Sequence, residues 1–450
     1  MTRSDPYQLT TENIKDPPTS FVGRLQHLGP GFILSASIVG SGELIATTTL
    51  GAQAGFVTFW VILVSCFIKV AVQVEIAKHT ILTGETAMQM LNKLPGRSFG
   101  EANWSIWAML IMMTLKLFQV GGIIGGSAII LNIVFPQIGI AAWAFIIAMI
   151  VASMIFRGYY KVIERFSLAM IVFFTLFTAL SVYFLQYTPY DFTWQQLAGG
   201  LQFRLPKDTV IYAIGAFGIT GVAGEEIIYY NYWCLEKGYA RYVGPKEDSQ
   251  EWRNRAKGWI NTMILDAVAA MVIYTFVTAL FYILGAAVLY EQGKLPAGYE
   301  MIETLSAIYT ESLGAGVKNI YLGGAFVVLF STLFAALASW TRLITDILGQ
   351  LKWINFDDFR QRSRWVAILA WVIPILWAFL FIYIKLPVIM IFSGGIVGAF
   401  ILFLIVFTTI DVRYKRTDKH FKPGITYDVV LWASILSICI VGIYGVWRLI

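Results

Sequence analysis

Two short segments of the sequence place glycines directly beside carboxylates. They are Gly40-Ser41-Gly42-Glu43 and Ala223-Gly224-Glu225-Glu226, and each lies inside a long apolar stretch. Carboxylate and carbonyl oxygens suit hard divalent cations, and a charge inside hydrocarbon marks a functional site by default. We therefore predict that both segments bind the substrate, with Glu43, Glu225 and Glu226 as ligands of a metal cation.

The competing explanation for these segments is structural. Small residues bring membrane helices close together, and the glutamates would then be ion-paired or protonated. If the segments form a site instead, the missing side chains at Gly40, Gly42 and Gly224 are expected to leave room for a hydrated ion. Three carboxylates at one depth repel one another and require a cation, a proton or a lysine nearby.

Four further polar residues in apolar stretches are candidates for coupling, ion pairing or snorkelling. Lys116 either pairs with one of the glutamates or takes part in substrate chemistry, and Gln119 lies about one helical turn further on. Asp266 either borders a vestibule or pairs with a basic loop residue. Lys69 is expected to extend its ammonium group toward the membrane interface.

The elements that position these residues are predicted to be membrane helices. Of 450 residues, 58% are hydrophobic and 13% are charged, whereas soluble domains have about 25% charged residues. The three cysteines and three histidines are dispersed, so a disulfide framework, a zinc site and Ser-His-Asp catalysis are excluded. We therefore expect no enzyme and no cofactor. The polar segment 1–26 lacks the apolar core of a signal peptide.

Long charge-free stretches predict eleven spans, since a membrane helix needs about 20 apolar residues. Basic loop residues orient such helices. With the N-terminus in the cytoplasm and the C-terminus outside, 25 of the 33 Lys and Arg residues lie in inner segments and 6 in outer ones. The predicted spans are 28–50, 55–78, 104–131, 139–156, 166–185, 209–233, 259–289, 317–348, 365–383, 387–410 and 427–446.

The two glycine-glutamate segments lie in the first and sixth spans, which cross the membrane in opposite directions. Opposed, interrupted helices are the signature of an inverted repeat around a central site. The predicted organisation is an N-terminal tail (1–26), a first repeat of helices 1–5 (27–190), a second repeat of helices 6–10 (191–410), and a basic loop with an extra helix 11 (411–450).

Several motifs resemble those of the Nramp metal transporters. They are His27-Leu28-Gly29-Pro30-Gly31-Phe32-Ile33-Leu34-Ser35, Leu82-Thr83-Gly84-Glu85-Thr86, Tyr159-Tyr160-Lys161-Val162-Ile163-Glu164 and Gly218-Ile219-Thr220-Gly221. The resemblance covers most of the chain. It implies an all-α polytopic membrane protein of the leucine-transporter type, with an inverted 5+5 repeat and discontinuous helices 1 and 6.

The sequence departs from the family at the positions that carry its chemistry. The family's Asp-Pro-Gly-Asn break falls on Gly40-Ser41-Gly42-Glu43, and its Met-Pro-His falls on Glu225-Glu226-Ile227. Acidic positions of the family's proton route match Lys116 and Gln119. We therefore expect a transporter for a hard divalent cation such as Mg²⁺ or Mn²⁺, working by alternating access without the usual proton coupling.

Two alternatives remain open. The chain could carry an organic solute such as an amine or amino acid, or it could be a membrane sensor or scaffold that no longer transports. The expected surroundings are the cell membrane and a small ion or solute. Nucleic acid is excluded as a partner, and a monomer is compatible with the sequence.

Overall fold

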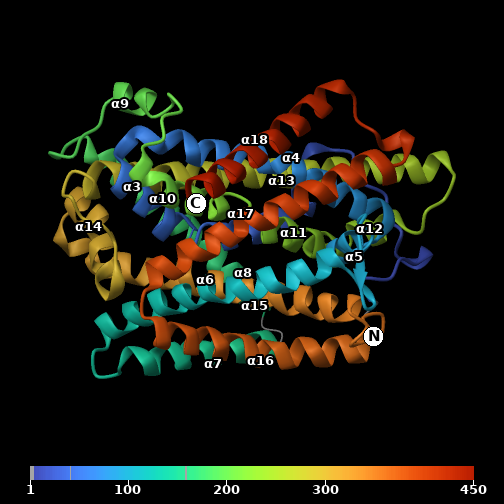
Figure 1. Cartoon of the computed structure of the whole chain (residues 1–450), viewed down its shortest axis with the longest axis horizontal. Coiled ribbons are helices and arrows are strands. Elements are labelled where there is room, and N and C mark those ends of the chain that lie inside the picture. Colours follow the sequence, from blue (N-terminus) through green and yellow to red (C-terminus); the bar gives the residue numbers. More distant parts are fainter. Residues whose placement is uncertain (1–4, 41, 158–159, 450) are drawn as a thin grey trace.

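The chain folds into long helices that run mostly along one direction of the molecule (Figure 1). In this computed structural model, the structure describes residues 5–40, 42–157 and 160–449. Ser41, one of the predicted site residues, and Tyr159 of the third family-like motif therefore lie outside the described residues. The remaining predicted site residues are all described.

The elements follow one another in the order expected for a polytopic helical protein. They are α1 (Phe21–His27), α2 (Pro30–Ile38), a π-helix (Gly42–Thr47), α3 (Thr48–Ala54), α4 (Phe59–Thr83), α5 (Ala87–Asn92), β1 (Ser98–Phe99), β2 (Ala102–Asn103), α6 (Trp104–Val134), α7 (Ile140–Arg157), α8 (Tyr160–Leu185), α9 (Trp194–Gly199), α10 (Val210–Ile219), α11 (Gly224–Lys237), α12 (Tyr239–Val243), α13 (Gln250–Leu284), α14 (Met301–Leu313), α15 (Lys318–Gln350), α16 (Phe359–Ile384), α17 (Pro387–Asp411) and α18 (Ile425–Leu449).

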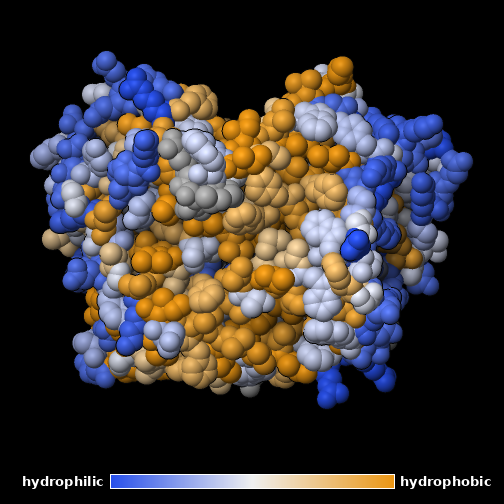
Figure 2. Space-filling view, viewed as in Figure 1, coloured by the Kyte–Doolittle hydropathy of each residue, from blue (hydrophilic) through white to orange (hydrophobic). Residues whose placement is uncertain are grey.

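The helices fit eleven membrane crossings. In the part of the chain that the structure describes, eight apolar helical runs are long enough to span a bilayer. The first of them, Pro30–Thr83, contains two crossings, α2 to α3 and α4. Two shorter apolar helices, Ile140–Phe156 and Val172–Leu185, complete the set. Figure 2 shows a hydrophobic belt across the middle of the molecule with hydrophilic residues at both ends. The predicted all-α polytopic architecture is confirmed.

The first and sixth crossings are both interrupted, as predicted. In the first, α2 ends at Ile38 and the π-helix begins at Gly42. In the sixth, α10 ends at Ile219 and α11 begins at Gly224. Gly221 lies in this second break with φ +62°, and a Cβ there would lie 2.9 Å from the Cα of Cys66 on α4. Glycine is therefore required at that position both by its backbone and by the neighbouring helix.

The two ends of the molecule are distinct. One end carries the N-terminus, α5 and α12, and the opposite end carries α9 and α14 (Figure 1). We call these the α12 side and the α9 side. The two breaks lie between them, within a core to which α2, α4, α10, α11, α13, α15 and α17 contribute buried residues. This arrangement places the predicted site at mid-depth.

Candidate functional site

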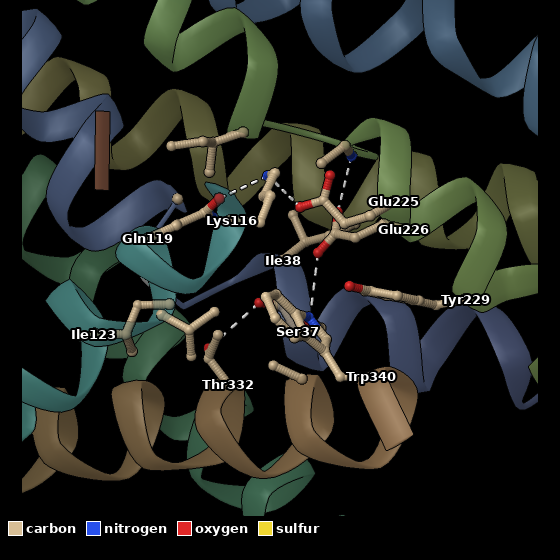
Figure 3. A pocket seen from close by; sticks show the side chains of 15 residues that line it. Ser37, Ile38, Lys116, Gln119, Ile123, Glu225, Glu226, Tyr229, Thr332 and Trp340 are labelled. Carbon is tan, nitrogen blue, oxygen red and sulfur yellow. Dashed lines mark hydrogen bonds and ion pairs between the residues drawn. The ribbon is translucent and has the colours of Figure 1, made fainter. Parts of the chain in front are cut away.

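A small cavity lies between the two broken helices (Figure 3). Its volume is about 30 Å³, which is space for roughly two water molecules. Helices α2, α6, α11 and α15 contribute most of its walls, and we call it the central cavity. Its lining residues are Ser37, Ile38, Gly42, Lys116, Gln119, Val120, Ile123, Ile219, Ala223, Glu225, Glu226, Tyr229, Thr332, Ala336 and Trp340.

Glu225 meets Lys116 in this cavity. The Nζ of Lys116 forms an ion pair with Oε1 of Glu225 and donates a second hydrogen bond, of 2.6 Å, to Oε1 of Gln119. Figure 3 shows the ammonium group between these two side chains. The other carboxylate oxygen of Glu225, Oε2, is buried and accepts no hydrogen bond from the described residues. That oxygen is therefore free to bind a ligand.

Glu226 ties the two broken helices together. Its Oε2 accepts a hydrogen bond of 2.9 Å from the backbone N–H of Ala223, and its Oε1 accepts one of 3.3 Å from the hydroxyl of Ser37 on α2. A carboxylate in the first turn of a helix interacts favourably with the positive end of the helix dipole. Glu226 is thus at once a cap of α11 and a wall of the central cavity.

Glu43 lies in the π-helix that follows the first break and is fully buried. Its Oε1 accepts a hydrogen bond of 2.9 Å from the Thr278 hydroxyl on α13, and it does not line the central cavity. Within the described residues there is no group of three Asp, Glu, His or Cys side chains placed to hold one metal ion. A single ion shared by Glu43, Glu225 and Glu226 therefore stays a prediction, since this conformation does not gather them.

The glycines of the two segments allow close packing rather than empty space. A Cβ at Gly40 would overlap the hydroxyl of Thr332, and a Cβ at Gly42 would lie 2.9 Å from the side chain of Ile219. At Gly224 it would lie 2.8 Å from Ile401 on α17. The expectation that these glycines leave room for a hydrated ion is wrong, because neighbouring groups already fill the space.

Two other polar residues form hydrogen bonds with backbone groups at the ends of the broken helices. Asp266 accepts hydrogen bonds from the backbone N–H groups of Gly29 (2.8 Å) and Gly31 (2.5 Å) at the start of α2, and from the hydroxyl of Tyr230 (2.9 Å). It does not line the central cavity. Lys69 is fully buried beside the end of α10. The expectation that Lys69 reaches the membrane interface is wrong, because the carbonyl groups of a broken helix lie within its reach.

Four lining residues with hydroxyl or indole groups had no assigned role in the sequence. Ser37 and Tyr229 carry hydroxyl groups into the central cavity, and Thr332 and Trp340 reach it from α15. Thr332 also donates a hydrogen bond of 3.3 Å to the carbonyl oxygen of Ser37. Nothing in the charge-free part of α15, residues 319–341, distinguishes these two residues from lipid-facing ones. For Tyr229 alone the sequence offers a signal, since it opens the polar run Tyr229-Tyr230-Asn231-Tyr232 within an apolar stretch.

The sequence profile of the family described as natural resistance-associated macrophage protein-like matches residues 31–448. The chain belongs to the Nramp family. A divalent metal cation transporter, MntH, from Xanthomonas campestris is 25% identical over 320 residues, which cover 70% of this chain and 67% of MntH. The relatives are transporters, which confirms the prediction of a transporter rather than an enzyme.

Similarity to solved structures identifies the fold class of this Nramp chain. A variant of the manganese transporter of Eremococcus coleocola matches with a TM-score of 0.66 at 15% identity, covering 97% of this chain and 90% of that one. Mhp1, a nucleobase-cation-symport-1 family transporter, matches with a TM-score of 0.57 at 14% identity, covering 96% and 95%. The leucine-transporter-type fold expected from the resemblance is confirmed. These two proteins share the fold while belonging to different transporter families.

Proposed function

We propose that this Nramp protein carries a divalent metal cation across the membrane by alternating access. The observation that supports the proposal most directly is the buried, unpartnered Oε2 of Glu225 in a cavity between two broken helices. In membrane transporters, such breaks form the substrate site near the middle of the bilayer. Metal cations are also the substrates named for MntH and for the manganese transporter.

The donor set favours a hard cation such as Mg²⁺ or Mn²⁺. The described lining of the central cavity contains carboxylate, hydroxyl and amide oxygens and no Met, Cys or His. Thioether and imidazole groups favour softer transition metals, whereas an all-oxygen set does not. Glu225 and Glu226 would bind the ion in this conformation, and Glu43 would join them when the π-helix moves.

Transport is proposed to proceed without proton coupling. The resemblance to the family implies that Lys116 and Gln119 fall at acidic positions of its proton route. Both residues line the central cavity. An incoming cation would compete with the Lys116 ammonium for the Glu225 carboxylate. The positive charge that balances Glu225 in the empty site would therefore come from a lysine side chain rather than from a bound proton.

We further propose that the N-terminus is cytoplasmic and that helices 1–5 (27–190) and 6–10 (191–410) form the repeats.

Uptake by proteoliposomes tests this function. The purified protein should accumulate Mg²⁺ or Mn²⁺ saturably, and Glu225→Gln and Glu43→Gln should each abolish saturable uptake. Glu303→Gln is a matched control, because Glu303 is an exposed glutamate on α14 and should leave uptake unchanged. A pH-sensitive dye inside the vesicles should report no substrate-dependent acidification.

Three results would each change the proposal. Strong Cd²⁺ binding that Mg²⁺ does not compete with would contradict the hard-cation site. Binding of an amine or amino acid with indifference to every metal would favour an organic solute. A folded protein that binds neither class would favour the sensor or scaffold.

A further inference from the structure

A second polar cluster lies beside the central cavity, where α4 crosses the end of α10. The Nζ of Lys69 donates hydrogen bonds to the carbonyl oxygens of Phe217 (2.5 Å) and Thr220 (2.9 Å). Ser65, one turn earlier on α4, donates to the same two carbonyls at 3.0 and 2.9 Å. We call Lys69, Ser65 and these two carbonyls the Lys69 cluster. Both side chains are fully buried.

The carbonyl groups are exposed to Lys69 because α10 stops. The last four carbonyls of a helix have no partner within it, and they carry the negative end of the helix dipole. Thr220 satisfies one of them, since its backbone N–H donates to the carbonyl of Ala216 at 2.7 Å. The carbonyls of Phe217 and Thr220 instead point toward α4. In transporters, the carbonyl ends of such half-helices coordinate monovalent cations.

The ammonium of Lys69 is held by dipoles and not by a carboxylate. Among the described ion pairs, none contains Lys69. Its Nζ also lies 4.8 Å from the centre of the Phe217 ring, which adds a cation–π interaction. Backbone carbonyl oxygens can replace the hydration shell of a monovalent cation, and an aromatic face attracts such a cation.

We propose that the end of α10 is a monovalent-cation site and that the Lys69 ammonium is its resident cation. The ligand class is Na⁺, K⁺ or a primary ammonium ion. Because Lys69 is tethered to α4, the site cannot exchange its cation with solution. The native protein should therefore be indifferent to Na⁺ and K⁺, whichever solute the central cavity carries.

Chemical rescue of Lys69→Ala tests the assignment. The purified full-length variant is heated in detergent with Na⁺, K⁺ or methylammonium chloride, against N-methylglucamine chloride at the same ionic strength. We expect at least one of the three small cations to raise the Tm of Lys69→Ala saturably, by about 2–4 °C. The native protein should show no such difference. Lys69→Met should not respond either, because its side chain fills the space.

Two further variants keep the outcome decisive. Lys78→Met is the matched control, since Lys78 is a buried lysine on the same helix that pairs with the Glu75 carboxylate at 2.6 Å. It should lose stability that no monovalent cation restores. Lys69→Gln is studied in parallel because Lys69→Ala can fail to fold. A specific cation response in Lys69→Ala or Lys69→Gln supports the site. Absence of a response in both, or failure of both to fold in every salt, overturns it.

Discussion

Lys116 of α6 and Glu225 of α11 form a buried ion pair beside the break of the sixth crossing. Each side chain is at least nine-tenths buried, so neither charge is solvated by bulk water. Removing one partner of a buried pair leaves the other charge uncompensated, which costs far more than replacing both partners with apolar groups. This asymmetry gives the first prediction.

Glu225→Leu should destabilise the protein by about 3–5 kcal/mol, because Lys116 loses its counter-charge, and Lys116→Met should likewise leave Glu225 unpaired. The double variant Lys116→Met with Glu225→Leu should recover most of that loss. The measurement is the free energy of unfolding in detergent for both single variants and the double variant, as a double-mutant cycle. Additive effects of the two substitutions would show that the pair is not coupled.

Glu226 should prove to be a cap as well as a cavity residue. Glu226→Gln keeps the acceptor for the Ala223 N–H and loses only the charge, at a cost of about 0.3–1 kcal/mol. Glu226→Ala leaves a buried N–H unpaired and should cost about 1–3 kcal/mol. Glu251, an exposed glutamate in the first turn of α13, is the control, and Glu251→Ala should change unfolding by under about 0.5 kcal/mol. Equal effects at both positions would contradict the capping role.

Asp266 should stabilise the first turn of α2. Asp266→Ala removes the acceptor of two backbone N–H groups, so the amides of Gly29 and Gly31 should exchange hydrogen faster than in the native protein. Tyr230→Phe removes only one hydrogen bond to Asp266 and should cost about 0.5–1.5 kcal/mol. Hydrogen exchange followed by mass spectrometry reports both. Unchanged hydrogen exchange at the start of α2 in Asp266→Ala would show that Asp266 does not stabilise the first turn of this helix.

The loop between α4 and α5 should make the protein sensitive to acid. A hydrogen bond from His79 (3.1 Å), supported by the Lys93 ammonium, lowers the pKa of the Glu85 carboxyl to about 2. The folded-state pKa is thus below that of the unfolded chain, near 4.3. Its stabilisation is fully present above about pH 5 and is lost as the pH falls toward 2. Glu85→Gln should therefore flatten the decline of Tm between pH 5 and pH 3.

Asp418, whose partners are exposed, provides a comparison for that experiment. Hydrogen bonds from the backbone and side chain of His420 lower the pKa of the Asp418 carboxyl. Asp418 is only half-buried, however, and both of its partners, His420 and Lys246, are exposed, so these interactions contribute little to stability. Asp418→Asn should leave the acid limb of the Tm curve close to that of the native protein. A flattening equal to that of Glu85→Gln would attribute the acid response to general surface charge.

The crossings and the two breaks could be predicted because their signals are local. A charge-free stretch and a glycine beside a glutamate are visible without knowing the fold. The environment of Lys69 was not predictable in the same way, because its partners are backbone carbonyls of a helix about 150 positions away. The amino-acid sequence does not indicate which backbone carbonyl groups a helix break will leave without a partner in the helix.

The packing role of the glycines was missed for a related reason. Gly40 and Gly42 signal a break, but whether the freed space stays open depends on which side chains face them. Thr332 and Ile219 fill that space, and they belong to other helices. The same limit applies to Trp340, whose place in the central cavity follows from how α15 is rotated. Rotation of an apolar helix is set by its neighbours more than by its own pattern.

Helices α10 and α17 touch through their backbones where they cross. Gly215 and Gly218 on α10 face Gly395 and Gly398 on α17, and a methyl group at Gly218 would overlap the Gly395 carbonyl oxygen. Side chains can slip past one another by changing rotamers, whereas interlocked peptide planes have no such freedom. We therefore expect α10 and α17 to move together as one rigid unit. In a transport cycle, a change of angle between α10 and α11 would then be confined to residues 220–223, which lie between the two helices.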